Sequence, residues 1–133
     1  MPKVTYLDTG CLLDAWKVKD CPAFDLLNDP DRVFVSSTVA RLELIPLAAF
    51  HKSAPEVAFY EDFFKSIRRW RKLDEGLLVE ALKLGSAHGL TAFDSLHLAA
   101  AADLKADEFI TTEKPGKSRL YRIGAPKVVY LYA

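Results

Sequence analysis

The sequence has few of the residues that build covalent or metal-linked scaffolds. It contains two cysteines, Cys11 and Cys21, and three histidines that lie far from both. This spacing fits neither a disulfide framework nor a zinc site, so the fold has to depend on an apolar core. Half of the 133 residues are hydrophobic, which is enough to build such a core. We therefore expect one domain that covers residues 1–133.

The chain also lacks net charge and long apolar runs. Eighteen basic residues balance eighteen acidic ones, so any contact with a polyanion has to come from a local patch. No apolar run approaches the ~20 residues of a membrane-spanning helix, and the first residues do not show a signal-peptide pattern. A location in the cytoplasm is the resulting expectation.

Strand and helix patterns alternate along the chain. Short β-rich segments stand at 3–7, 32–35, 108–111 and 127–132, and Leu73 fits a further short strand. The clearest helical patterns cover about 56–71, 75–87 and 91–104. Pro46 lies inside another helical pattern, where it predicts a kink or a break. The alternation predicts an α/β fold, a three-layer α/β/α sandwich with a mostly parallel central sheet.

Four acidic residues fall where ligands collect in such a fold, beyond the carboxyl ends of parallel strands. Asp8 and Glu113 follow predicted strands, Glu43 lies in the helix after the second strand, and Asp94 lies at the start of the 91–104 helix. Each also has a structural interpretation. Asp8 fits a helix N-cap, Asp94 fits a capping pattern that begins at Thr91, and Glu113 fits an exposed loop.

Glu43 and Asp94 stand out because their helices are apolar. Glu43 lies between Leu42 and Leu44, and a helix that is apolar on most faces is typically buried, so we expect a cation beside this carboxylate. Asp94 precedes an almost wholly apolar helix that we expect at the centre of the core. His97, one turn further on, could orient Asp94; a hydrogen-bonded core histidine is the alternative.

Together these acids would form a strongly negative pocket with oxygen ligands only. Hard cations such as Mg²⁺ or Mn²⁺ prefer carboxylate and water ligands. Such ions activate water and polarise phosphoryl oxygens. A phosphodiester is therefore the expected class of substrate.

The segments around the four acids resemble the motifs of PIN domains, in the family's order and over nearly the whole chain. They are Tyr6–Leu13, Ser36–Leu44, Ala92–Ala101 and Phe109–Glu113, and the third is the most specific. In its size the chain is similar to VapC-type toxins. The resemblance implies a Mg²⁺- or Mn²⁺-dependent ribonuclease that forms a homodimer and is neutralised by a small antitoxin protein.

The resemblance also assigns roles to residues. It makes Asp8, Glu43 and Asp94 the principal metal-site acids and Glu113 the probable fourth, with Thr9 and Thr111 holding water or a neighbouring carboxylate.

Two residues depart from the family pattern: Gly10 replaces a frequent Asn, and Glu113 replaces the usual Asp. They leave open an inactive PIN-like module that binds RNA or protein. A phosphatase of the haloacid-dehalogenase type is disfavoured because it needs an Asp where this chain has Gly10.

Two groups of cations with interleaved aromatic residues are candidates for RNA contact. One surrounds Trp70 and consists of Lys65, Arg68, Arg69, Arg71 and Lys72. It also fits the charge order of a solvated helix end, which is its structural interpretation. The other contains Lys114, Lys117, Arg119 and Arg122 with Tyr121. It directly follows Glu113, so it is the better candidate.

Overall fold

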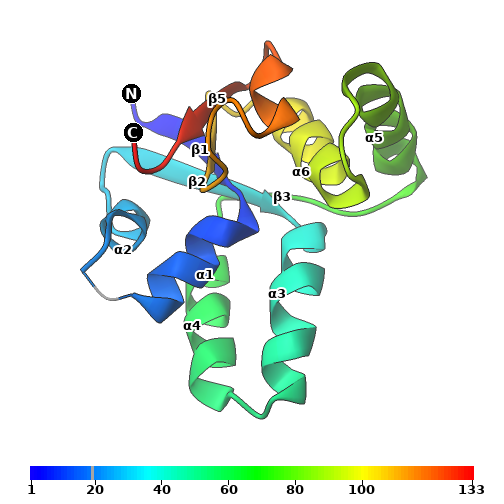
Figure 1. Ribbon diagram of the computed structural model, residues 1–133. Coiled ribbons are helices and arrows are strands. Elements are labelled where there is room, and N and C mark those ends of the chain that lie inside the picture. Colours follow the sequence, from blue (N-terminus) through cyan, green and yellow to red (C-terminus); the bar gives the residue numbers. More distant parts are fainter. Residues whose placement is uncertain (19) are drawn as a thin grey trace.

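A computed structural model describes residues 1–18 and 20–133 of the chain. Within these residues it contains five strands, six α-helices and one 3₁₀ helix (Figure 1). In chain order they are β1 (Lys3–Leu7), α1 (Thr9–Lys17), α2 (Pro22–Leu27), β2 (Arg32–Ser37), α3 (Thr38–Phe50), α4 (Ala54–Lys65), β3 (Arg69–Arg71), α5 (Glu75–His88), α6 (Ala92–Asp103), β4 (Glu108–Thr111), η1 (Arg119–Arg122) and β5 (Lys127–Tyr130). None of the described helices combines the length and the hydropathy needed to cross a membrane.

The strands form one sheet in the order β3-β2-β1-β4-β5, and every neighbouring pair is parallel. Helices α1 to α4 lie on one side of this sheet, and α5 and α6 lie on the other (Figure 1). The predicted three-layer α/β/α sandwich with a parallel sheet is confirmed.

Alternating side chains along the strands explain why both faces of the sheet are covered. In β1, Tyr6 packs in the core with α5 and α6, whereas Leu7 packs in the core with α1, α3 and α4. Phe109 and Ile110 divide in the same way in β4. Because successive side chains of a strand point to opposite faces, each central strand is buried on both sides.

The helix predicted over 56–71 is wrong at its end. Helix α4 stops at Lys65, and Arg69–Arg71 forms the edge strand β3, paired with Val35–Ser37 of β2. The predicted strand at Leu73 is therefore wrong as well. The open edge of β2 decides the outcome, because pairing there and packing of Trp70 on Phe64 outweigh a local helical pattern.

Helix α3 differs from its prediction in two respects. It runs without a break through Pro46, which is exposed. The backbone carbonyl that proline leaves without its usual helical partner belongs to Leu42, a residue that is itself 56% exposed. Leu47 and Phe50 are exposed too, and the expectation that α3 is buried on most faces is wrong.

Gly10, in the first turn of α1, lets the chain after β4 pass unusually close. A Cβ atom at position 10 would lie 2.5 Å from Thr112 Oγ1, which is closer than such atoms normally approach. Thr112 immediately precedes Glu113, so this contact helps to set where Glu113 lies relative to Asp8. The departure from the family's Asn therefore has a steric reason in this chain.

We predict that Gly10→Ala destabilises the protein by about 1 kcal/mol. Overpacking costs ~1–3 kcal/mol, and the better helix propensity of Ala offsets up to ~1 kcal/mol of it. Urea denaturation measures the difference. In a Thr112→Ala background the clash is gone, so the same substitution should become neutral or stabilising. If Gly10→Ala with Thr112 in place has the same free energy of unfolding as the parent, the steric explanation is refuted.

Candidate active site

Asp8 joins the end of β1 to the start of α1 and uses both carboxylate oxygens. Oδ1 accepts a hydrogen bond from the Thr9 backbone N–H at 2.9 Å, and Oδ2 accepts one from Thr111 Oγ1 at 2.8 Å. The residue is only 9% exposed. Burial raises the pKa of Asp8, and the Thr111 hydrogen bond opposes that shift. Asp8 therefore caps α1 and also presents a crowded carboxylate at the carboxyl end of the central strand.

Asp94 and Glu113 converge on Asp8. One carboxylate oxygen from each of the three residues lies within 4.8 Å of the others. Asp94 stands in the first turn of α6, where its backbone N–H donates to Thr91 Oγ1 at 3.3 Å. Burial, followed by the negative charges of Glu113 and Asp8, raises the pKa of Asp94 to about 6. We call these three residues the carboxylate cluster.

Glu113 is the exposed member of the carboxylate cluster. Its backbone N–H donates to Thr111 Oγ1 at 3.1 Å, and its Oε2 accepts a hydrogen bond from Ser118 Oγ at 2.8 Å. The Thr111 hydroxyl group thus forms hydrogen bonds with both Asp8 and Glu113. Two of the three carboxylates are held from one strand end, that of β4.

Glu43 is the fourth predicted acid, and it lies beside the carboxylate cluster rather than in it. Its side chain is 24% exposed and pairs with His97 Nε2. Thr9 Oγ1 is 3.4 Å from the same carboxylate oxygen, Oε1. Glu43 therefore has a hydrogen-bonding partner on α6, and no Lys or Arg side chain pairs with it within residues 1–18 and 20–133. The suggestion that His97 orients Asp94 is replaced by this direct contact with Glu43.

A buried chain of hydrogen bonds stands behind Glu43. His97 Nδ1 lies 2.6 Å from Tyr6 Oη, which lies 2.7 Å from Ser37 Oγ. A neutral imidazole has one donor and one acceptor nitrogen, and the carboxylate of Glu43 calls for a donor at Nε2. Nδ1 must then accept a hydrogen bond from Tyr6, and Ser37 donates to Tyr6. Burial raises the pKa of Tyr6, which keeps its proton in place.

Sequence reasoning missed Tyr6 and Ser37. Both lie on neighbouring strands, β1 and β2, and both are fully buried with a polar tip. The signal in the sequence was weak: a tyrosine and a serine at core positions of strands, each of which needs a hydrogen-bond partner when buried. Which partner each would find depended on the pairing of β1 with β2 and on the position of α6.

The predicted RNA-contact residues after Glu113 have different fates. Arg119 Nη1 donates to the carbonyl of Gly89 at 2.9 Å, at the carboxyl end of α5. Tyr121 Oη donates to the carbonyl of Glu113 at 2.6 Å. Lys114 and Lys117 are exposed, and neither forms an ion pair within residues 1–18 and 20–133. Arg122 is exposed and without an ion pair as well, so three cations of this group, Lys114, Lys117 and Arg122, are available for phosphate contact within the described part of the chain.

The group around Trp70 is split by the fold. Arg69 Nη2 donates to the carbonyl of Leu104 at 2.9 Å, and Arg71 pairs with Asp74 and Asp103. These two arginines tie β3 to the segments around it. Their role is structural, but the solvated helix end expected from the sequence is wrong for them, because α4 stops at Lys65.

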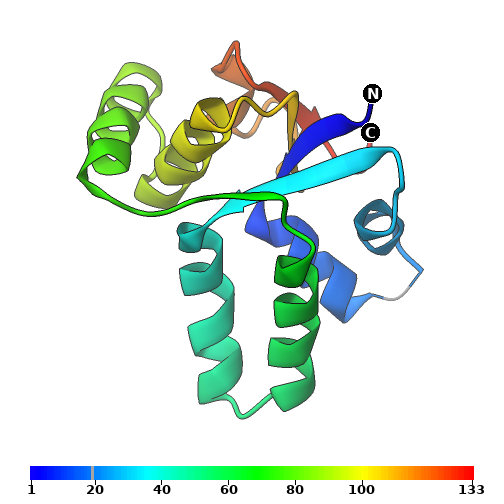
Figure 2. The ribbon, with the colours of Figure 1, turned by 180° about the vertical axis from the view of Figure 1, so that it is seen from behind.

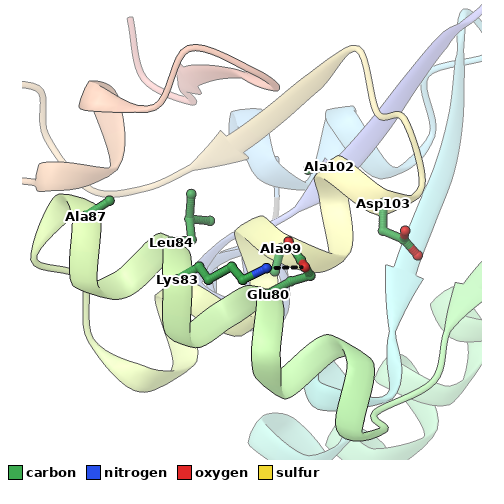
Figure 3. A pocket seen from close by; sticks show the side chains of 7 residues that line it. All are labelled: Glu80, Lys83, Leu84, Ala87, Ala99, Ala102 and Asp103. Atoms are coloured by element: carbon green, nitrogen blue, oxygen red, sulfur yellow. Dashed lines mark hydrogen bonds and ion pairs between the residues drawn. The ribbon is translucent and has the colours of Figure 1, made fainter.

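The hollow between α5 and α6 does not belong to this site. A cavity of about 470 Å³ lies there, and Figure 3 shows the side chains that line it. Its lining residues are Glu80, Lys83, Leu84, Ala87, Ala99, Ala102 and Asp103. Lys83 and Glu80 form an ion pair at its rim, and none of the four predicted acids contributes to the lining. This cavity is therefore not part of the candidate active site, which is defined by the positions of the four acids.

The donor set of the carboxylate cluster fits a hard divalent cation. It offers carboxylate oxygens only, and they converge closely enough to share one ion. Burial raises the pKa of both Asp8 and Asp94, and the charge of Glu113 acts in the same direction on each. A divalent cation would relieve both effects.

We predict that Asp94→Asn stabilises the metal-free protein at pH 7.5 by about 1 kcal/mol, discounted for the partial exposure of this residue. The folded pKa of about 6 exceeds the ordinary 3.8, so folding takes up protons between these values and stability falls as the pH rises through that window. Denaturation in EDTA at pH 7.5 and pH 4 measures the effect, which should vanish at pH 4.

The exposed Asp62 provides a control, and Asp62→Asn should change stability by less than 0.5 kcal/mol, roughly the value of a surface pair. A loss of stability for Asp94→Asn at pH 7.5 in EDTA would mean that the carboxylate is net stabilising, contrary to the crowding argument.

Known structures share the fold of this chain. The structure is similar to VapBC2 from Rickettsia felis bound to a promoter DNA fragment, with a TM-score of 0.74, 12% identity and coverage of 96% of this chain and 98% of that one. A toxin-antitoxin complex from Klebsiella pneumoniae gives a TM-score of 0.71, 19% identity and coverage of 96% and 98%. DNA-bound VapBC from Salmonella typhimurium gives a TM-score of 0.71 and 18% identity, with coverage of 98% of this chain and 99% of that one.

At these identities the solved structures show a shared fold. A search of curated proteins gives no significant match. The PIN domain family model matches residues 5–115, a stretch that contains all four predicted acids. This chain belongs to the PIN-domain family.

Proposed function

We propose that this protein is a metal-dependent endoribonuclease that hydrolyses RNA phosphodiester bonds at Asp8, Glu43, Asp94 and Glu113. The observation that carries the proposal is the convergence of three carboxylates, from three separate elements, within 4.8 Å. Membership in the PIN-domain family supports hydrolysis of nucleic acid. Repelling carboxylates cost stability, so an inactive binding module would have no physical need for them.

Asp8, Asp94 and Glu113 are the residues that would hold Mg²⁺ or Mn²⁺. When bound, such an ion lowers the pKa of a coordinated water and polarises a phosphoryl oxygen. Thr111 steadies Asp8 through its hydroxyl group, and Thr9 lies between Asp8 and Glu43. These contacts support the proposal that the two threonines orient neighbouring carboxylates.

We infer that Glu43 accepts a proton at the edge of the cluster. Its Oε1 faces His97 and Thr9, while Oε2 receives no hydrogen bond within the described part of the chain. That oxygen can take the proton of a water positioned beside the cluster. Lys114 and Lys117 contact the RNA phosphates from the loop after Glu113, and Arg119 adds positive charge from its position at α5.

We further propose that residues 1–133 act as one cytoplasmic domain, the toxin of a toxin-antitoxin pair, and that the chain forms a homodimer. The similar solved structures are VapBC or toxin-antitoxin complexes. In this chain α5 presents Leu78, Val79 and Leu82 to solvent, and Leu82 is 71% exposed. Three neighbouring large apolar side chains are typical of a protein interface.

We predict that Asp8→Asn and Asp94→Asn each reduce Mg²⁺- or Mn²⁺-dependent cleavage of a labelled RNA by at least about 100-fold. Millimolar metal should raise the melting temperature of the parent but not of Asp94→Asn, because only an intact site binds it. Asp62→Asn should behave as the parent in both assays.

The outcomes separate the alternatives. Metal stabilisation of the parent without RNA cleavage would favour the binding module. If neither parent nor variant responds to metal, the site assignment is wrong.

We predict that the isolated protein has twice the 14.9 kDa mass of one chain in light scattering. Leu82→Lys should shift it to the single-chain mass, because it places a charge in the apolar interface. Val18→Lys is the control, since Val18 is also exposed but lies after α1. A parent of 14.9 kDa would refute the homodimer and leave the α5 surface to the antitoxin.

A further inference from the structure

A second pocket with cationic walls lies where α3, α4 and β3 meet. It has a volume of about 370 Å³, and its lining residues are Thr38, Arg41, Glu61, Phe64, Lys65, Trp70 and Lys72. Figure 2 shows α3 and α4 side by side, with the chain passing from α4 through β3 across the sheet edge. None of the four acids of the proposed active site lines it.

Planar side-chain groups, one guanidinium group and two aromatic rings, pack against one another in the wall of this pocket. The guanidinium carbon of Arg41 lies 5.5 Å from the centre of the Phe64 ring, and the Trp70 ring lies 5.5 Å from the same ring. Glu61 accepts from Arg41 at 3.1 Å and pairs with it at 2.7 Å, which holds the guanidinium plane in place. Indole and guanidinium planes are the surfaces on which nucleobases stack.

The charge of the pocket favours an anion. Arg41, Lys65 and Lys72 are opposed by one lining carboxylate, Glu61. Lys72 forms no ion pair within the described residues, and Lys65 has only a loose one, 3.7 Å long, with the exposed Asp62. Arg69 and Arg71 come from the same stretch of sequence, but both are engaged elsewhere. The structure thus separates the available cations from the structural ones.

The pocket and the active-site residue Glu43 lie on opposite sides of one helix, α3. Arg41 and Glu43 are two residues apart on α3, so they point to opposite sides of it, and the exposed Leu42 stands between them. A helix with its side chains is ~10–12 Å wide. Thr38 follows Ser37 at the carboxyl end of β2, the edge of the sheet at which Asp8 also lies. A single strand that crosses the start of α3 therefore meets both sites.

We propose that this pocket binds one nucleotide of the RNA strand, next to the bond that is cut. The base stacks against Trp70 and Arg41, and the flanking phosphates contact Lys72 and Lys65. The inference rests on the proposed ribonuclease function, since it names where the substrate continues beyond the carboxylate cluster. Stacking and point charges do not select a base, so the subsite accepts all four bases.

Tryptophan fluorescence tests the proposal directly, because the chain has only Trp16 and Trp70. In Trp16→Phe, Trp70 is the only indole. A mixed-sequence single-stranded RNA of eight nucleotides, titrated in EDTA to prevent cleavage, should quench its emission. Fluorescence polarisation of an end-labelled copy of this RNA measures the variants without relying on Trp70. Trp70→Ala should weaken RNA binding between about 5- and 150-fold, and Lys72→Gln should weaken it and lower its salt dependence.

Matched variants separate binding from folding. Trp70→Phe retains an aromatic face and should keep most of the affinity, and Lys83→Gln, on the far side of the sheet, should match the parent. With metal present, Trp70→Ala should raise KM for RNA and leave kcat within about twofold. Thermal unfolding of each variant shows whether a loss of affinity reflects a loss of fold.

Three results would overturn the inference in distinguishable ways. If the parent cleaves RNA while Trp70→Ala and Lys72→Gln keep the parental Kd and KM, the pocket is not a subsite and the proposed function stands. If the parent neither binds nor cleaves RNA, both fail. If poly-L-glutamate quenches Trp70 and RNA does not, the pocket receives an acidic protein segment.

Discussion

Mutual repulsion among Asp8, Asp94 and Glu113 is the constraint that the rest of the structure has to withstand. The side chains would separate if they were free to move, but the positions of their backbones on the sheet and on α6 keep them together. Asp8 is held at the junction of β1 and α1, and Asp94 at the capped start of α6. Because β1 and β4 are adjacent and parallel, Thr111 reaches Asp8, and Glu113 follows two residues later.

The opposite end of the sheet sets the register on which this depends. Glu108 is buried in β4, where it accepts from Thr5 Oγ1 at 2.6 Å and from Arg32 Nε at 2.8 Å. One carboxylate thereby links β1, β2 and β4. A slip of one residue would turn Thr111 to the other face and remove its bond to Asp8. A partly buried ion pair between Arg32 and Glu108 at one end of the sheet thus supports a cluster without ion pairs at the other.

The sequence predicted the parts that follow from local pattern. Asp8 and Asp94 could be located because strand ends and helix starts are readable, and parallel strands bring their ends to one edge. The pairing of Glu43 with His97 could not, because it depends on how α3 packs on α6. The strand at Trp70 was hidden for a similar reason: its pairing edge on β2 exists only after folding, whereas the helical pattern was visible in the sequence.

The four acids are therefore not equivalent, and their difference indicates where a cation belongs. Glu43 has a donor supplied by the protein, His97, whose tautomer follows from Tyr6 and Ser37. None of the three cluster carboxylates forms an ion pair within the described residues, and burial raises the pKa values of two of them, Asp8 and Asp94. A metal ion would compensate charge only where the protein has not already done so. This asymmetry supports metal binding by Asp8, Asp94 and Glu113, with Glu43 free to act on a proton.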